Sequence, residues 1–190
     1  MDIVLAGPHG AGKTTLGLGL AQELGVEFQP EIGRQLAEDR HWRPAGCDAS
    51  MAQLGFDLEV VRRELRRDAA WPCDRLRVVE TWHPGNLAYL LARSPALATW
   101  AIPQMVAACR RRPSLVVMVD CADDVLKCRQ SEPGERRFFT AVGRDARRCA
   151  QLLGLPVALT VDGTATLEQS VGHVVAAITQ MQSRLTKKAA

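Results

Sequence analysis

The sequence predicts an α/β fold, in which helices cover both faces of a parallel β-sheet. Five short apolar runs are separated by segments long enough to form helices. Continuous apolar runs of this kind are typical of strands that are buried on both faces. After the first run, Leu16, Leu20 and Leu24 recur at every fourth residue, which is the spacing of one helix face. A chain of 190 residues is long enough to bury a sizeable core as one domain.

The predicted elements alternate between strand and helix along the chain. Gly17 and Gly19 lie inside the first predicted helix, where each costs about 1 kcal/mol relative to Ala. We therefore expect both glycines to allow a close approach of this helix to the sheet. We also expect a single domain over residues 1–186 and a frayed tail over 187–190. The predicted strands cover residues 2–6, 26–29, 75–80, 114–120 and 156–161, and the first helix covers 13–24.

A glycine-rich loop follows the first predicted strand. Residues 7–14 read GPHGAGKT and fit the spacing G-x-x-x-x-G-K-[ST] of a P-loop, whose backbone N–H groups surround the phosphates of a nucleotide. We expect Lys13 to bridge the β- and γ-phosphates and Thr14 to be a ligand of Mg²⁺. His9 occupies a free position of the motif, where a solvent-facing side chain without a role is the alternative. The residues predicted to bind the nucleotide are Gly7, Pro8, His9, Gly10, Ala11, Gly12, Lys13, Thr14 and Thr15.

Two carboxylates follow the second and third predicted strands, where ligands of parallel sheets collect. Glu31, in FQPEIGRQ, is placed to orient an acceptor hydroxyl and take its proton as general base, or else to cap the following helix. Arg34, one helical turn later, can grip an acceptor phosphate or pair with Glu31. Glu80, in VVETWHPG, can hold Mg²⁺ directly or through water. Asp120, at the end of the fourth strand, is the rival for that role.

Aromatic and polar residues follow Glu80 directly. Trp82 can stack on a planar ring of a bound acceptor, or else fill the core. His83 is expected to be structural or a hydrogen-bond donor rather than a general base, because Glu31 already fits that role. The residues predicted to bind an acceptor are Glu31, Arg34, Glu80, Trp82, His83, Asn86 and Tyr89.

Arginines gather between the fourth and fifth predicted strands. Arg129, Arg136 and Arg137 flank a Pro-Gly turn between two expected helices. Arginines on a hinged segment can close over ATP and neutralise charge on the transferred phosphoryl group, so we expect a catalytic lid at about residues 130–140. The loop after the last strand, VDGTAT, is expected to contact adenine at Asp162 and Gly163.

The composition argues against several classes of protein. The net charge is +3, and 20 of the 24 basic residues are Arg, which suits bidentate phosphate contacts. The six cysteines form no C-x-x-C pair, which argues against a zinc site and against a disulfide scaffold. No apolar run reaches the roughly 18 residues of a membrane span, and the P-loop strand stands where a signal peptide would be. We therefore expect a cytoplasmic protein.

The order of these motifs resembles the P-loop nucleoside and nucleotide kinases, in particular thymidylate kinases, deoxynucleoside kinases and the ribosylnicotinamide kinase domain. The resemblance rests on GPHGAGKTTL, on PE-x-x-R after the second strand, on an acidic residue with Thr after the third, on the arginine-rich segment and on the terminal VDG. It implies a three-layer sandwich with five parallel strands in the order 2-3-1-4-5, and the use of ATP and Mg²⁺. It also implies that Glu31 lies near the acceptor hydroxyl and that Glu80 opens the Glu-Arg-Ser motif of deoxynucleoside kinases. This chain has Glu80-Thr81-Trp82 there, and the missing arginine argues against an ordinary thymidylate substrate.

We therefore expect an ATP- and Mg²⁺-dependent kinase that transfers the γ-phosphoryl group to a hydroxyl or phosphate of a nucleoside-type acceptor. A hydroxymethylated base in phage DNA is an alternative acceptor. A regulatory P-loop NTPase is the alternative of another class, because a P-loop alone does not distinguish transfer from hydrolysis. The resemblance to thymidylate kinases is also compatible with a homodimer.

Overall fold

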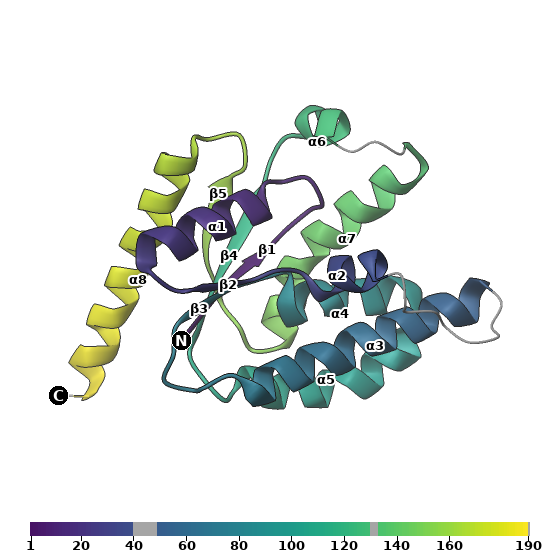
Figure 1. Ribbon diagram of the computed structural model, residues 1–190, viewed down its shortest axis with the longest axis horizontal. Coiled ribbons are helices and arrows are strands. Elements are labelled where there is room, and N and C mark those ends of the chain that lie inside the picture. Colours follow the sequence, from purple (N-terminus) through teal and green to yellow (C-terminus); the bar gives the residue numbers. More distant parts are fainter. Residues whose placement is uncertain (40–48, 130–132, 190) are drawn as a thin grey trace.

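A parallel β-sheet lies at the centre of the molecule (Figure 1). The computed structural model describes residues 1–39, 49–129 and 133–189. Within these residues, five parallel strands lie in the order β2-β3-β1-β4-β5, so the predicted α/β fold and the implied strand order are confirmed. The strands are β1 (Asp2–Ala6), β2 (Glu27–Gln29), β3 (Arg77–Glu80), β4 (Ser114–Asp120) and β5 (Val157–Asp162).

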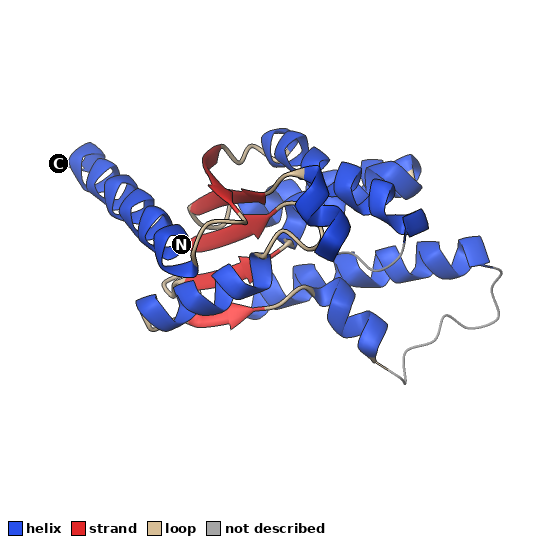
Figure 2. Cartoon of the chain, turned by 90° about the horizontal axis from the view of Figure 1, so that it is seen from above, coloured by secondary structure: helices blue, strands red, loops and turns tan. Residues whose placement is uncertain are grey.

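Helices connect the strands and cover both faces of the sheet (Figure 2). In chain order the helices are α1 (Lys13–Leu24), α2 (Ile32–Glu38), α3 (Ala49–Ala70), α4 (Trp82–Arg93), α5 (Pro95–Cys109), α6 (Asp123–Arg129), α7 (Pro133–Leu152) and α8 (Leu167–Ala189). α1 and α8 pack together on one face, whereas α4 packs against α3, α5 and α7 on the other. This is the expected three-layer sandwich. In the described parts of the chain, no helix has the length and apolar character that crossing a membrane requires.

Alternate residues of the central strands face opposite layers. In β1, Ile3 and Leu5 pack in the cluster that contains α1 and α8, while Val4 packs in the cluster of α4, α5 and α7. In β3, Val78 and Val79 divide between the two clusters in the same way. Because side chains of a strand alternate between its faces and both faces are covered, both sets must be apolar. This is why these strands read as continuous apolar runs.

The observed boundaries differ from the predicted ones at three strands. β1, β4 and α1 have the predicted bounds, and β5 is shifted by one residue. β2 begins at Glu27, one residue late, because the N–H of Val26 donates to the Ala21 carbonyl (2.9 Å) and closes α1. β3 begins at Arg77, two residues late. α8 extends to Ala189, and the fraying expected for residues 187–190 stays a prediction.

The two glycines of α1 serve different contacts. A Cβ on Gly17 would lie 2.3 Å from a ring carbon of Phe28, so this glycine lets α1 approach β2, as predicted. A Cβ on Gly19 would lie 2.9 Å from Leu167, which belongs to α8. The prediction that Gly19 serves contact with the sheet is therefore wrong, because that side of the helix meets another helix.

Candidate functional site

The loop between β1 and α1 has the backbone conformation that only glycine adopts easily. Gly7, Gly10 and Gly12 have φ angles of 142°, 81° and 98°. A Cβ on Gly7 would also lie 2.0 Å from the carbonyl oxygen of Val119 in β4. The glycines of the motif thus permit both the sharp turns of the loop and its close contact with the sheet.

Lys13 lies inside this loop and is 6% exposed. Its Nζ donates hydrogen bonds to the carbonyl oxygens of Gly7 (3.0 Å) and Pro8 (2.8 Å). Burial lowers the pKa of Lys13, while the charges of Glu31 and Glu80 oppose that shift. The ammonium group is therefore held in the loop, next to the carboxylates of two neighbouring strands.

A cavity of about 670 Å³ opens over the P-loop. Across from the loop its wall comes from the β5–α8 connection, where a Cβ on Gly163 would lie 2.0 Å from the carbonyl oxygen of Ala11. Arg129 joins the two sides, since its Nη1 donates to the carbonyl oxygens of Gly10 and Gly163, each at 3.2 Å. The lining residues are His9, Gly10, Ala11, Gly12, Lys13, Thr14, Thr15, Leu16, Arg34, Glu80, Val119, Arg129, Val161, Gly163, Ala165, Leu167 and Ser170.

Three elements meet in a polar cluster at the edge of this cavity. Thr14 Oγ1 donates to Glu80 Oε1 at 2.9 Å. Arg34 Nη1 donates to Thr14 Oγ1 (3.1 Å), and its Nη2 donates to Glu80 Oε1 (3.3 Å). Arg34 also lies 3.8 Å from the Glu31 carboxylate. The structure therefore brings together four of the residues predicted from separate stretches of the sequence.

The cluster has the ligand chemistry that Mg²⁺ prefers. Glu80 is 1% exposed, and its Oε2 has no hydrogen-bond partner among the described residues. A hydroxyl and a carboxylate with a spare oxygen suit Mg²⁺, which is usually held by one or two protein groups together with substrate phosphates. The described residues contain no group of three His, Cys, Asp or Glu side chains that could hold a metal. Asp120 is not among the lining residues of the cavity over the P-loop, and its Oδ2 lies 3.6 Å from Arg144 Nε.

A second cavity, of about 460 Å³, adjoins the first. The two share His9 and Arg34, so they meet at the P-loop. Burial and the charge of Lys13 lower the pKa of His9 and so favour its neutral imidazole. The second cavity is lined by His9, Glu31, Gly33, Arg34, Ala37, Gln53, Phe56, Asp57, Val60, Asn86, Tyr89, Arg93 and Phe139.

The wall of the second cavity includes a carboxylate that sequence reasoning missed. Asp57 Oδ1 accepts hydrogen bonds from Arg93 Nη1 (2.9 Å) and Gln53 Nε2 (3.1 Å). Asp57 Oδ2 is buried and has no partner within the described residues, and burial raises the pKa of this carboxyl. The Arg93 guanidinium lies 5.0 Å from the ring centres of both Tyr89 and Phe138. The one signal in the sequence was the four-residue spacing of Gln53 and Asp57 on a helix.

The expected role of Trp82 as a stacking surface is wrong. Trp82 is 1% exposed and His83 is fully buried, and neither lines the two cavities of the described structure. Both donate to Asp68 in α3, Trp82 through Nε1 (3.0 Å) and His83 through Nε2 (2.7 Å). The turn after Glu80 directs these side chains away from the cavities. Trp82 therefore fills the core, and His83 is structural.

The remaining predicted residues lie in several places. Asn86 and Tyr89 line the second cavity. Asp162 lies outside the cavity linings, and its Oδ1 accepts hydrogen bonds from the N–H and hydroxyl of Thr164. Arg137 is exposed on α7. The side chain of Arg136, and residues 130–132 of the expected lid, lie outside the described residues.

Comparison with known protein families agrees with the P-loop geometry. Residues 2–161 match the AAA domain family. The chain belongs to this family. The matched part of this AAA domain runs from β1 into β5, so it contains the P-loop and both strand-end carboxylates. No curated protein matches the sequence significantly.

Solved structures share the fold of this AAA domain. The deoxyadenosine kinase of M. mycoides has a TM-score of 0.64 at 10% identity, covering 95% of this chain and 100% of that one. The thymidylate kinase of Ehrlichia chaffeensis has a TM-score of 0.63 at 15% identity, covering 94% of this chain and 98% of that one. The shikimate kinase of Aquifex aeolicus has a TM-score of 0.53 at 15% identity, covering 96% of this chain and 98% of that one. The fold expected from the resemblance, that of P-loop kinases, is thereby confirmed.

Proposed function

We propose that this AAA domain is a kinase that transfers the γ-phosphoryl group of ATP, with Mg²⁺, to a hydroxyl of a nucleoside-type acceptor. The observation that carries the proposal is the junction of two cavities at His9 and Arg34, one over the P-loop and the other beside Glu31. A donor and an acceptor held in adjoining cavities are oriented for reaction before it begins. A protein that only hydrolyses nucleotide has no need of the second cavity.

On the nucleotide side, the start of α1 supplies backbone N–H groups and the positive end of a helix, which together bind phosphate. Lys13 and Arg129 add positive charge to the wall of the first cavity. Thr14 and Glu80 are the residues that would hold Mg²⁺, because they combine a hydroxyl with an unpartnered carboxylate oxygen. The chemistry that Mg²⁺ supplies when bound with ATP is neutralisation of phosphate charge and orientation of the γ-phosphate.

On the acceptor side, Glu31 is the residue proposed to orient the hydroxyl and take its proton. A carboxylate at this position suits a hydroxyl but repels a phosphate. Arg34 and Arg93, the arginines among the described residues of this cavity, are already paired with Glu80 and Asp57. The second cavity therefore favours an acceptor hydroxyl over an acceptor phosphate.

The aromatic side chains of the second cavity favour an acceptor with a planar ring. Phe56, Tyr89 and Phe139 lie in its wall, and aromatic faces stack on bases. The name of one structural neighbour, deoxyadenosine kinase, points to the same class of acceptor. A nucleoside combines such a ring with a sugar hydroxyl.

The test is phosphoryl transfer from γ-labelled ATP with Mg²⁺ across a panel of nucleosides, nucleotides, shikimate and DNA with hydroxymethylated bases. We expect labelled nucleoside monophosphate from at least one nucleoside. Lys13→Ala, the control, should abolish transfer and leave the unfolding midpoint nearly unchanged. Label that appears as free phosphate alone, whatever the acceptor, would instead support a regulatory NTPase.

A further inference from the structure

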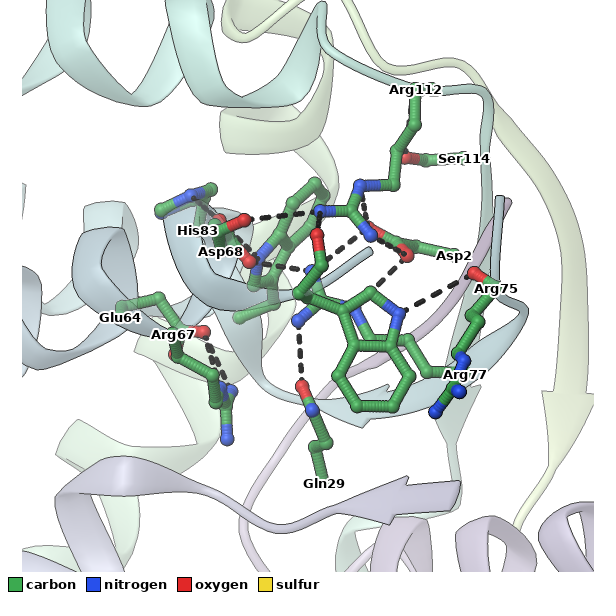
Figure 3. A network of polar contacts seen from close by, with 12 residues as sticks. Asp2, Gln29, Glu64, Arg67, Asp68, Arg75, Arg77, His83, Arg112 and Ser114 are labelled. Carbon is green, nitrogen blue, oxygen red and sulfur yellow. Dashed lines mark hydrogen bonds and ion pairs between the residues drawn. The ribbon is translucent and has the colours of Figure 1, made fainter. Parts of the chain in front are cut away.

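A buried carboxylate outside both cavities joins the end of α3 to the turn after Glu80 (Figure 3). Asp68 is 2% exposed and accepts hydrogen bonds from Trp82 and His83 at the start of α4, and from Arg77 in β3. Burial raises the pKa of Asp68, but the hydrogen bonds and charges of His83 and Arg77 outweigh it and lower the pKa to about 2. Asp68 is therefore ionised and acts as acceptor to all three donors.

The turn that Asp68 contacts has an unusual backbone. Thr81 separates β3 from α4 and has φ 67° and ψ −60°, and Trp82 has φ 47°. Both residues have a positive φ, which β-branched and bulky side chains avoid. Such a conformation persists only where surrounding contacts hold it. The N–H of Thr81 donates to the Leu5 carbonyl (2.8 Å) on one side, and Asp68 holds Trp82 and His83 on the other.

We propose that Asp68 is a positioning residue, which holds this strained turn and thereby keeps the Glu80 carboxylate against Thr14. Glu80 directly precedes the turn, and its Oε1 accepts from the Thr14 hydroxyl at 2.9 Å. If the turn relaxes at Thr81, the backbone that carries Glu80 rotates and the carboxylate leaves its place. The inference rests on the proposed function, since it gives Glu80 its importance in the nucleotide and Mg²⁺ site.

The same network contains a matched carboxylate that does not reach the turn. Asp2, fully buried at the start of β1, accepts from Arg77 Nε (3.0 Å) and Nη2 (2.9 Å). Asp2 also accepts from Arg112. Asp2 and Asp68 thus share Arg77 as a donor, but of the two only Asp68 contacts Trp82. The same substitution at either position removes one charge beside Arg77, so the pair separates loss of stability from loss of positioning.

The experiment compares Asp68→Asn with Asp2→Asn, and adds Trp82→Phe, which removes the indole N–H together with part of the buried ring system and leaves Asp68 in place. Binding of a fluorescent ATP analogue is followed by anisotropy while Mg²⁺ is titrated, and the unfolding midpoint of each variant is measured. We expect both Asn variants to lower the midpoint. Asp68→Asn should raise the half-saturating Mg²⁺ concentration about tenfold, the lower end of the effect of losing a direct outer partner of a metal ligand, because Asp68 acts on Glu80 through the turn. Trp82→Phe should give a smaller shift in the same direction, and Asp2→Asn none.

Each outcome decides between the inference and its alternatives. The positioning role is overturned if the half-saturating Mg²⁺ concentration is unchanged in both Asp68→Asn and Trp82→Phe. It is also overturned if Asp2→Asn raises that concentration as much as Asp68→Asn does. If Asp68→Asn does not fold, Trp82→Phe and Asp2→Asn decide alone by the same measurement. A wild-type protein that binds the analogue without regard to Mg²⁺, or does not bind it, counts against the proposed function instead.

Discussion

At the scale of single residues, substitution of the two strand-end carboxylates, Glu31 and Glu80, should cause different kinetic defects. Glu31→Gln keeps the size of the side chain but removes its basicity, so kcat should fall by roughly 10² to 10⁴ while ATP binding is nearly unchanged. Glu80→Gln should instead raise the Mg²⁺ requirement, with partial rescue by excess metal, because Glu80 is buried against Thr14. Steady-state kinetics at several Mg²⁺ concentrations measure both effects. Rescue of Glu31→Gln by Mg²⁺, but not of Glu80→Gln, would exchange the two roles.

Asp57 predicts which rings the second cavity prefers. Its Oδ1 is held by Arg93 and Gln53, and its Oδ2 is unpartnered among the described residues, so a bound ring that donates an N–H satisfies it. Nucleosides with an exocyclic amino group, such as adenosine and cytidine, should be favoured over thymidine and uridine, whose N3–H lies between two carbonyl oxygens that repel a carboxylate. Asp57→Asn should lower kcat/KM for the amino-bearing acceptors by about 10- to 100-fold, the range expected for a hydrogen bond to a charged group. An equal loss of kcat/KM for acceptors with and without the amino group would contradict this role of Asp57.

At the scale of elements, α3 supports the ends of two strands through adjacent residues. Asp68 holds the turn after β3, while Arg67 Nη1 donates to the Pro30 carbonyl (2.8 Å), next to Glu31. The other nitrogens of Arg67 are held by Glu64, which is 1% exposed. The C-terminal part of this helix therefore fixes the backbone from which both carboxylates reach the cavities.

This arrangement predicts that Arg67→Lys lowers kcat about tenfold without weakening nucleotide binding. A lysine cannot bond Glu64 and Pro30 together as the guanidinium does, so the backbone at Glu31 loses its support. Arg63→Lys is the matched control, because Arg63 pairs with Glu59 on the same helix. Single-turnover kinetics and nucleotide titrations of the two variants provide the check. A similar fall in kcat in the control would mean that α3 stability alone matters.

At the scale of the whole molecule, the Asp68 network joins α3, β3 and α4 and predicts a component of acid stability. The pKa of Asp68 is lowered to about 2 in the folded protein, against an ordinary value of 3.8. A lowered pKa stabilises the fold above the ordinary value, by about 2 kcal/mol here, and this stabilisation disappears as the pH falls from about 4 to about 2. The difference in unfolding free energy between wild type and Asp68→Asn should therefore shrink over that range in denaturant titrations. A difference in unfolding free energy that stays constant down to about pH 2 would contradict this contribution of Asp68 to stability.

Part of the site could be predicted because it depends on local pattern. The P-loop places Lys13 and Thr14 by its own spacing, and parallel strands bring Glu31 and Glu80 to one edge of the sheet wherever the helices lie. Asp57 and Arg93 could not be found in this way. They are 36 positions apart and meet only because α3 packs beside α4.

By itself, the sequence determined the α/β class, the phosphate-binding loop and the edge of the sheet where the carboxylates gather. These follow from residue spacing and from the alternation of side chains along buried strands, which do not depend on distant contacts. Only the tertiary structure decided the shape of the second cavity and the inward direction of Trp82. Thr81 and Trp82, which form the turn after Glu80, are not glycines, so the sequence does not indicate their positive φ angles. Asp68, the partner that holds this turn, lies 14 residues before Trp82. Such contacts are set by how helices pack on the sheet, and no local pattern in the sequence specifies that packing.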